Sequence, residues 1–319
     1  RADTTPQVAR LDAHILNRAG ATRLCYCGPV LHTQARGLHT TREPLQCGAE
    51  LYGCAGIQAD LEIISLASEV LGLAGLKQYR LAFSHAGLVS ALLEGVSVSK
   101  SQLSQIHHAL AFKDEPELRS VLVSLPKKTA DAVLMVTRLY GQAKQVLAQA
   151  HEKLPQTDQV LKVLNELETV TKALQQNSPG GLEVMIDLAD IASFDYHSGL
   201  IFSAYSAGCP NPVLRGGRYD DVGSVYGRAR PATGFSVDLR ELVALTHLKV
   251  EPVSAIRAPW GNDPALLAKV RELRSQGEVV VQSLPETQAE EEEFICNREL
   301  VADEKGSWTV VPEGHTGEN

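Results

Sequence analysis

Two short stretches joined by a polar loop decide the fold of this 319-residue chain: CYCGPVLH at residues 25–32 and REPLQCGAELYG at residues 42–53. Three more stretches follow in order, DYHSG at 195–199, GGRYD at 216–220 and ATGF at 232–235. A short motif is weak when it stands alone. Together, and in this one order, these stretches form a specific pattern.

This ordered set resembles the active-site frame of the class II aminoacyl-tRNA synthetases, and of the histidyl-tRNA synthetases in particular. The resemblance implies an α+β fold: a mainly antiparallel sheet flanked by helices, with a helical insertion and a small α/β C-terminal tail. It also implies that residues 26–31 and 44–52 are antiparallel strands joined by a loop at 33–42, and that residues 239–245 form a helix.

A change of character along the chain predicts the domains. Between residues 97 and 176, glycine is almost absent and apolar residues recur at helical spacing, which indicates the helical insertion. We therefore expect a synthetase-like core at 1–96 and 177–249, the insertion at 97–176, and a small α/β domain at 250–319. The resemblance further implies an additional segment ahead of Arg1 that carries the first class II motif.

Capping residues and apolar spacing predict the individual elements. Asp60 and Ser84 are expected to cap helices that end near residues 72 and 95, because aspartate and serine are favoured at the N-cap. Gly216 and Gly217 are interpreted as sites of close backbone approach in the sheet. Further strands are expected at 78–83, 183–188, 200–205, 256–258 and 279–281, and further helices at 11–19 and 264–274.

The resemblance fails at positions where the synthetases carry arginine. The chain has Leu31 and His32 where they have a phenylalanine–arginine pair, Ala192 where the histidyl enzymes have a specific arginine, and Glu241 at the closing arginine of the third motif. Adenylate formation gathers negative charge on phosphoryl oxygens, which bidentate arginine stabilises. Each lost donor costs about 2.7–4 kcal/mol of transition-state stabilisation. We therefore predict no catalytic residues.

A pocket for free histidine is expected to survive, because the resemblance keeps its polar residues. A carboxylate and a hydroxyl at Asp3 and Thr5 can hold an α-ammonium, and Glu50 can accept from an imidazole N–H. Gln46 and Glu50 share a strand face because they are an even number of residues apart. The alternative is that these are ordinary polar residues at a sheet edge. The expected histidine-binding residues are Asp3, Thr5, Gln46, Glu50, Tyr196 and His197.

A synthetase frame without its arginines resembles the regulatory subunits of short-form ATP phosphoribosyltransferase. The opening RADTT at residues 1–5 and the variant YHSG at 196–199 both match that family. The resemblance implies a non-catalytic, cytoplasmic chain that supports a catalytic partner and confers inhibition by L-histidine in the first step of histidine biosynthesis. It also implies a dimer within a hetero-octamer, no cofactor of its own, and Mg²⁺ only in the catalytic partner.

Two other functions stay open at this point. One is a synthetase-like sensor for another amino acid or another partner, and the other is an active histidyl-tRNA synthetase. Recovery of a small phosphoribosyltransferase, rather than of tRNA or a kinase, from a cell extract would favour the regulatory subunit. Histidine-dependent pyrophosphate exchange into ATP would instead favour the synthetase.

Composition narrows the possible partners. The net charge of −8 and the pI near 5.7 argue against a broad surface that tracks phosphates, so no nucleic acid is expected. No apolar stretch has the length of a membrane span. The six cysteines lack metal-ligand spacing and are interpreted as buried free thiols, so no metal site is expected. His107 and His108 are adjacent, so one should face the core and the other water.

Overall fold

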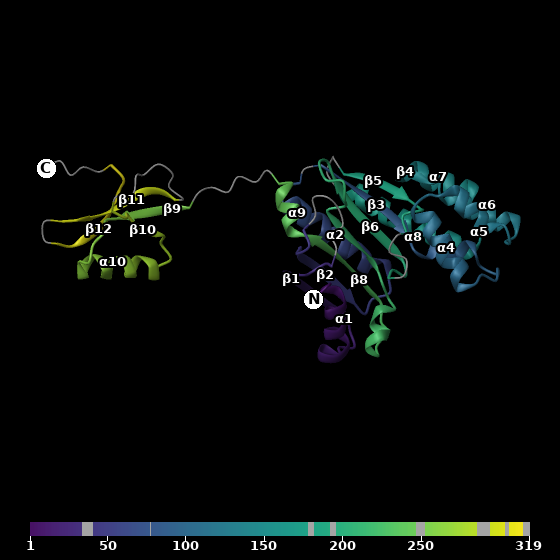
Figure 1. The fold of residues 1–319 in the computed structure, drawn as a ribbon, viewed down its shortest axis with the longest axis horizontal. Helices are drawn as coiled ribbons and strands as arrows, with labels where there is room; N and C mark the ends of the chain where they lie inside the picture. The colour runs from purple at the N-terminus through teal and green to yellow at the C-terminus, as the bar shows by residue number, and fades with distance from the viewer. Residues whose placement is uncertain are drawn as a thin grey trace. The chain divides into compact units, whose positions relative to one another are not determined.

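The computed structural model describes residues 1–33, 41–76, 78–177, 182–191, 196–246, 253–285, 294–303 and 306–314. The chain divides into two compact units, Arg1–His247 and Leu248–Asn319. Figure 1 shows that each unit has its own sheet, packed with several helices in the first unit and with α10, Pro264–Ser275, in the second. The finer division of the first unit into a core at 1–96 and 177–249 and an insertion at 97–176 stays a prediction.

An eight-stranded sheet organises the first unit, with the order β1-β2-β8-β7-β6-β3-β5-β4. Neighbouring strands are antiparallel except for the parallel pair β3 and β5. Strands from both ends of this unit's sequence therefore lie side by side. The strands are β1 Thr22–Pro29, β2 Leu45–Tyr52, β3 Tyr79–His85, β4 Tyr140–Gln142, β5 Glu183–Asp187, β6 Leu200–Ser206, β7 Leu214–Arg218 and β8 Ala232–Asp238.

The pairing of β1 with β2 confirms the strand pair expected from the first two stretches. The pair is antiparallel in a register that sets Thr22 opposite Tyr52 and Pro29 opposite Leu45. β1 begins earlier than expected, because Thr22 to Cys25 also pair with β2. Most of the expected loop at 33–42 lies outside the described residues.

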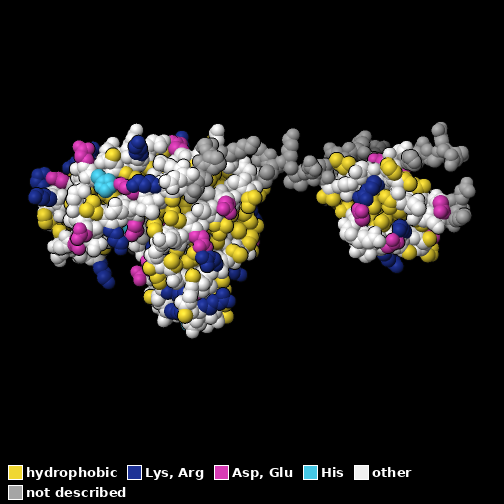
Figure 2. All heavy atoms as spheres, turned by 180° about the vertical axis from the view of Figure 1, so that it is seen from behind, with side chains coloured by type: hydrophobic (Ala, Val, Ile, Leu, Met, Phe, Trp, Pro, Cys, Tyr) yellow, Lys and Arg dark blue, Asp and Glu magenta, His cyan; other side chains and the backbone are white. Residues whose placement is uncertain are grey.

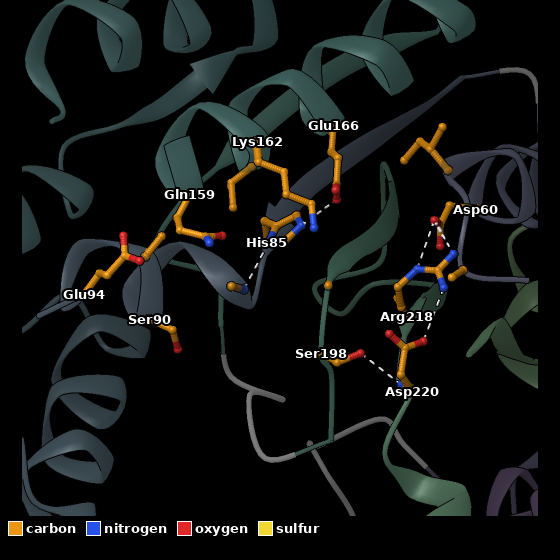
Figure 3. A pocket seen from close by; sticks show the side chains of 16 residues that line it. Asp60, His85, Ser90, Glu94, Gln159, Lys162, Glu166, Ser198, Arg218 and Asp220 are labelled. Carbon is orange, nitrogen blue, oxygen red and sulfur yellow. Dashed lines mark hydrogen bonds and ion pairs between the residues drawn. The ribbon is translucent and has the colours of Figure 1, made fainter. Parts of the chain in front are cut away.

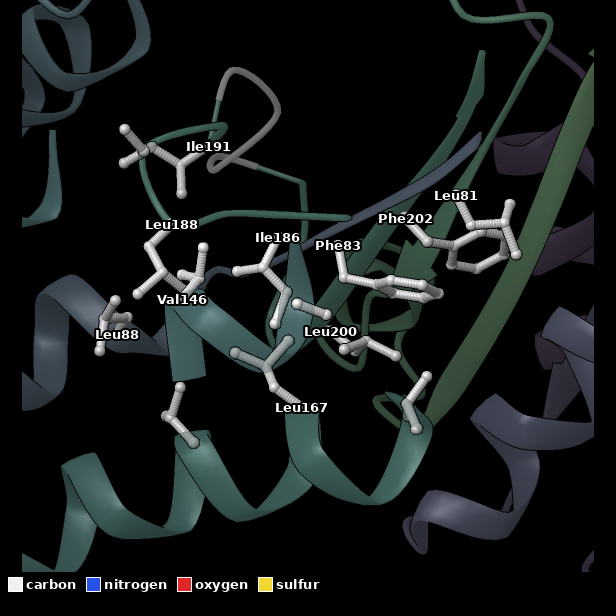
Figure 4. Packing of buried hydrophobic residues seen from close by; sticks show 14 of the residues in the cluster. Leu81, Phe83, Leu88, Val146, Leu167, Ile186, Leu188, Ile191, Leu200 and Phe202 are labelled. Carbon is white, nitrogen blue, oxygen red and sulfur yellow. The ribbon is translucent and has the colours of Figure 1, made fainter. Parts of the chain in front are cut away.

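Helices cover one face of this sheet, which we call the rear face. α2 packs on β2, β7 and β8, and α8 packs on β3 and β5. Figure 4 shows how Leu167 of α8 lies against apolar side chains of the sheet, Phe83, Ile186 and Leu200 among them. The helices of this unit are α1 Thr5–Arg10, the π-helix η1 Leu11–Leu16, α2 Ile57–Leu73, α3 Gly87–Leu92, α4 Lys100–Ala111, α5 Glu115–Leu122, α6 Lys127–Val136, α7 Ala143–Lys153, α8 Asp158–Asn177, the 3₁₀-helix η2 Val222–Tyr226 and α9 Leu239–Ala244.

Both expected helix caps were wrong. α2 begins after Gly56, and Asp60 lies inside it, where its carboxylate forms a buried ion pair with Arg218 of β7. Ser84 belongs to β3 and donates its hydroxyl to the carbonyl oxygen of Asp190 at 2.5 Å. In both cases a partner distant in sequence takes the side chain that local preference assigns to a helix end.

The region expected to be helical contains α4 to α8, but it also supplies one strand. β4 pairs with β5, so helical periodicity was the wrong interpretation from Leu139 into this strand. His107 is buried and His108 is exposed, as predicted. The cysteine prediction was wrong in part, because Cys25 and Cys27 are exposed on β1 and only Cys296 is fully buried.

The second unit has a four-stranded sheet with the order β10-β9-β11-β12. Leu266, Val270 and Leu273 of α10 are buried in its core. Pro264 begins this helix, where the helix expected at 264–274 starts, and Asp263 caps it. Its elements are β9 Ser254–Ala258, α10 Pro264–Ser275, β10 Val280–Gln282, β11 Ile295–Ala302 and β12 Trp308–Pro312.

Two broader expectations can be compared with the described residues. None of the helices described is both long and apolar enough to cross a bilayer. Likewise, no group of three or more His, Cys, Asp or Glu side chains in the described segments is arranged to hold a metal ion. On the face shown in Figure 2, basic side chains are interspersed with acidic ones.

Candidate functional site

The face of the large sheet opposite α2, which we call the front face, carries the candidate site. Side chains alternate along a strand, so Gln46 and Glu50 of β2 point to the front while Ala49 and Leu51 pack in the rear core with α2. Tyr26 of β1 reaches the same site. Gln46 and Glu50 therefore share one face of the strand, as their even spacing predicted.

Glu50 is the centre of the site and is only 2% exposed. One carboxylate oxygen accepts from the Tyr26 hydroxyl at 3.2 Å, and the other accepts from the Tyr219 hydroxyl. The Thr5 hydroxyl lies 3.0 Å from that of Tyr26. Burial raises the pKa of Glu50 to about 7, against the opposing effect of these hydrogen bonds. The carboxyl can therefore change its protonation state near neutral pH.

Asp3 and Gln46 form the second part of the site. The Gln46 amide donates to Oδ1 of Asp3 at 2.8 Å and accepts from the backbone N–H of Thr4 at 2.9 Å. The backbone N–H of Thr5 also donates to Oδ1 of Asp3, at 3.2 Å. Gln46 thus fixes the N-terminal segment over β2. Oδ2 of Asp3 is not used in these bonds and can accept from a ligand.

Tyr196 completes the aromatic wall of the site. Its ring centroid lies 5.0 Å from that of Tyr219 and 5.2 Å from that of His197. Burial, followed by the charge of Glu50, raises the pKa of the Tyr196 hydroxyl. This buried hydroxyl has no hydrogen-bond partner among the described residues. An unsatisfied buried hydroxyl costs about 1–3 kcal/mol, so its position favours a polar ligand atom beside it.

The structure thus brings Asp3, Thr5, Gln46, Glu50 and Tyr196 into one hydrogen-bonded and aromatic cluster. His197 lies beside Tyr196 and over Gly217, where an added Cβ would come within 2.5 Å of the imidazole ring. The close approach expected at Gly217 is therefore present, although a side chain and not only backbone requires it.

Sequence reasoning missed three contributors to this site. Tyr26 and Tyr219 donate to Glu50, and both stood inside stretches already recognised as motifs. Gly234 of β8 pairs with Glu50, and an added Cβ would lie 1.6 Å from Oε2 of that carboxylate. The pairing of β1, β2, β8 and β7 would have been needed to find them.

Next to this cluster lies a cavity of about 830 Å³, which Asp3 and Gln46 also line. Two of the positions that lack the synthetase residues, His32 and Glu241, line it as well. Burial and then the neighbouring charge of Asp238 raise the pKa of Glu241. The carboxylates of Asp3, Asp238 and Glu241 outnumber the one guanidinium among the described residues of this lining, Arg215, which disfavours a polyphosphate. Leu31 is 58% exposed, and Ala192 lies outside the described residues.

The fold and this site define a protein of the class II synthetase type, closest in design to the histidyl enzymes. The family described as histidyl-tRNA synthetase matches residues 1–242. A histidyl-tRNA synthetase structure from Nostoc sp. has the same fold, with a TM-score of 0.70 and 17% identity over 98% of this chain and 81% of that one. The α+β class II prediction is confirmed.

The chain belongs to the family of ATP phosphoribosyltransferase regulatory subunits. The family described as ATP phosphoribosyltransferase subunit HisZ C-terminal domain matches residues 253–311. Regulatory subunits from Ralstonia pickettii and Cupriavidus necator are 50% and 49% identical over 312 residues, which are 98% of this chain and 79% of each relative. The prediction of a regulatory subunit, with catalysis in another chain, is confirmed.

Two solved structures connect the family with the fold. A Bacillus halodurans protein described as an ATP phosphoribosyltransferase regulatory subunit/histidyl-tRNA synthetase has a TM-score of 0.75 and 28% identity over 91% of this chain and 75% of that one. A Thermotoga maritima structure described as the ATP phosphoribosyl transferase (HisG:HisZ) complex has a TM-score of 0.58 and 19% identity over 75% of this chain and 80% of that one. At that identity the second likeness concerns the fold alone.

Proposed function

We propose that this chain binds a short-form ATP phosphoribosyltransferase catalytic subunit, supports its activity, and inhibits it when L-histidine occupies the front-face site. Membership of the regulatory-subunit family supports both this role and assembly with a catalytic chain. ATP, phosphoribosyl pyrophosphate and Mg²⁺ would bind in that partner. The assembly would contain dimers of this chain within a cytoplasmic hetero-octamer.

The observation that carries the ligand assignment is the buried pair of Glu50 and the unsatisfied Tyr196 hydroxyl. An imidazole has a nitrogen that can donate to Glu50 and a second nitrogen that can accept from Tyr196. Few other side chains offer a donor and an acceptor on one flat ring. The aromatic ring of Tyr219, 5.0 Å from that of Tyr196, can pack against such a ring.

The amino end of histidine would lie near the N-terminal segment. Oδ2 of Asp3 is available to accept from an α-ammonium, while Oδ1 is held by Gln46. Gln46 therefore acts by positioning Asp3. Thr5 likewise positions the Tyr26 hydroxyl, which lies 3.0 Å from its own. These contacts give Gln46 and Thr5 an indirect role in recognition.

Calorimetry with L-histidine tests the site. The wild-type protein should bind, and Tyr196→Phe should weaken binding by about tenfold because it removes a hydrogen bond of about 1–1.5 kcal/mol. The ligand-free Tyr196→Phe protein should be as stable as wild type or more so, because the hydroxyl removed is unsatisfied there. Tyr140→Phe, at an exposed tyrosine, is the matched control and should change neither quantity.

Absence of binding heat with millimolar L-histidine would reject the pocket, and full affinity in Tyr196→Phe would reject the role of its hydroxyl. In the complex, inhibition should weaken with binding, since feedback requires a coupling of about 1–3 kcal/mol between two sites. Histidine-dependent pyrophosphate exchange into ATP would contradict the non-catalytic role.

A further inference from the structure

A second cavity, of about 540 Å³, lies on the rear side of the large sheet. Its walls come from the start of α2, from α3, from α8 and from the end of β7. On β7, Arg218 lines this cavity while Arg215, three residues earlier, lines the front cavity. Residues an odd number apart on a strand face opposite sides of the sheet. The rear cavity is therefore separate from the proposed histidine site.

The guanidinium of Arg218 in the floor of the rear cavity is already fully hydrogen-bonded, whereas Oδ1 of its partner Asp60 has no hydrogen-bond partner among the described residues. The Arg218 guanidinium bonds twice to Asp60, at 3.1 and 2.6 Å, once to Asp220 at 3.2 Å, and to the carbonyls of Cys54 and Gly56 at 3.2 Å. It has little donor capacity left for a ligand. This buried network fixes the shape of the floor.

His85 also lines the rear cavity, and its two ring contacts fix a single tautomer. Its Nδ1 accepts from the backbone N–H of Gly87 at 3.0 Å, so the ring proton lies on Nε2 and is donated to Glu166 at 3.0 Å. Neutral His85 therefore joins the end of β3 to α8. Hydrogen bonding by His85 lowers the pKa of Glu166, which keeps that carboxylate ionised.

The rim of the rear cavity, in contrast, carries two side chains of opposite charge that have no hydrogen-bond partner in the part of the chain that the structure describes. Lys162 on α8 and Glu94 just beyond α3 both line the cavity, and neither side chain forms a hydrogen bond or a close ion pair within the described segments, although the charge of Lys162 also acts on Glu166. Gln159 lies one turn before Lys162 on the same face of α8, and Ser90 lies four residues before Glu94. Figure 3 shows these side chains around the opening, with Gln159 between Glu94 and Lys162.

We infer that the rear cavity binds a small zwitterion, a free α-amino acid, with its carboxylate on Lys162 and its ammonium on Glu94. The carboxylates of Asp60, Glu94, Glu166 and Asp220 outnumber the cations of Lys162 and Arg218, which disfavours a phosphate. The ammonium of Lys162 equally disfavours a dication. Ser90 and Gln159 supply neutral hydrogen-bonding groups beside both charges.

Occupancy would have a structural consequence. Lys162 belongs to α8, which lies within the region expected to be the helical insertion, whereas Glu94 follows β3 and α3. A zwitterion held by both would join α8 to the segment just after α3. It would add to the existing bond between His85 of β3 and Glu166 of α8. The ligand should therefore raise the thermal stability of the chain.

Calorimetry in a Glu50→Gln background tests this site without the proposed histidine pocket. A panel of L-amino acids at millimolar concentration should include one that binds with a stoichiometry of one. Its methyl ester and its N-acetyl derivative should bind more weakly, because each removes one charge. Lys162→Met and Glu94→Gln should each weaken binding by about tenfold or more, as expected for loss of a charged hydrogen bond.

Lys172→Met is the matched control, since this lysine lies on α8 but does not line the cavity. It should leave binding unchanged, and circular dichroism should show that all variants are folded. The inference is overturned if no amino acid in the panel binds, if Lys162→Met retains wild-type affinity, or if inorganic phosphate binds in place of amino acids. Each of these results is independent of whether histidine binds at the front-face site.

Discussion

The buried carboxyl of Glu50 should make the stability of this protein depend on pH in an unusual direction. Burial raises its pKa from 4.5 to about 7 in the folded chain. Below pH 4.5 the carboxyl is protonated in both folded and unfolded chains, so it contributes no difference. Above about pH 7 it is ionised in both, and the folded chain bears the full desolvation cost. Stability should therefore fall as pH rises between these values.

The size of the effect follows from the shift in pKa. At about 1.4 kcal/mol for each pH unit, a rise from 4.5 to about 7 corresponds to about 3 kcal/mol at pH 8. Glu50→Gln removes the ionisation and keeps the side-chain volume. The difference in free energy of unfolding, variant minus wild type, should grow by about 2–3 kcal/mol from pH 5 to pH 8.

Urea denaturation at a series of pH values measures this difference directly, because both proteins share every other titrating group. Glu69→Gln, at an exposed position on α2, is the control and should give no such trend. Parallel stability curves for wild type and Glu50→Gln from pH 5 to pH 8 would refute the account of a desolvated carboxyl. A difference of opposite sign would show that the tyrosine hydrogen bonds outweigh burial.

Two other variants test how the sheet supports its two faces. Gly234→Ala would place a Cβ 1.6 Å from Oε2 of Glu50. We expect calorimetry to show loss of histidine binding and urea denaturation to show destabilisation of about 1–3 kcal/mol. Unchanged affinity would show that Glu50 can move without consequence for binding. Arg218→Met leaves Asp60 as an uncompensated buried charge and should destabilise the chain by about 3–5 kcal/mol. The double variant Arg218→Met/Asp60→Leu should recover much of this loss, because it also removes the buried carboxylate. Equal stability of the single and double variants would contradict the buried ion pair.

Much of the front-face site could be predicted because it depends on spacing along one strand. Gln46 and Glu50 share a face by alternation alone, and β2 pairs with β1 as expected. The donors to Glu50 could not be predicted in this way. Tyr219 is 169 residues away from it in sequence, and only the adjacency of β2, β8 and β7 brings the two together.

The misassigned caps have a related physical cause. Local preference assigns Asp60 and Ser84 to helix ends, since no local feature reveals a distant partner. In the fold, Arg218 and the carbonyl of Asp190 satisfy them instead. β11 and β12 of the second unit were missed because apolar Ile295 and Val301 of β11 are exposed and no residue of β12 is fully buried, so neither strand shows the clean alternation of a half-buried strand.

The sequence by itself determined the α+β class, the family, and the loss of the arginines that adenylation needs, because order and residue type along the chain carry these properties. Only the tertiary structure decided that Glu50 is desolvated and that Tyr196 lacks a partner. It also placed a mixed-charge cavity behind the sheet, between α3 and α8. Burial and hydrogen-bond satisfaction are properties of the whole assembly of strands and helices, so no local pattern of residues encodes them.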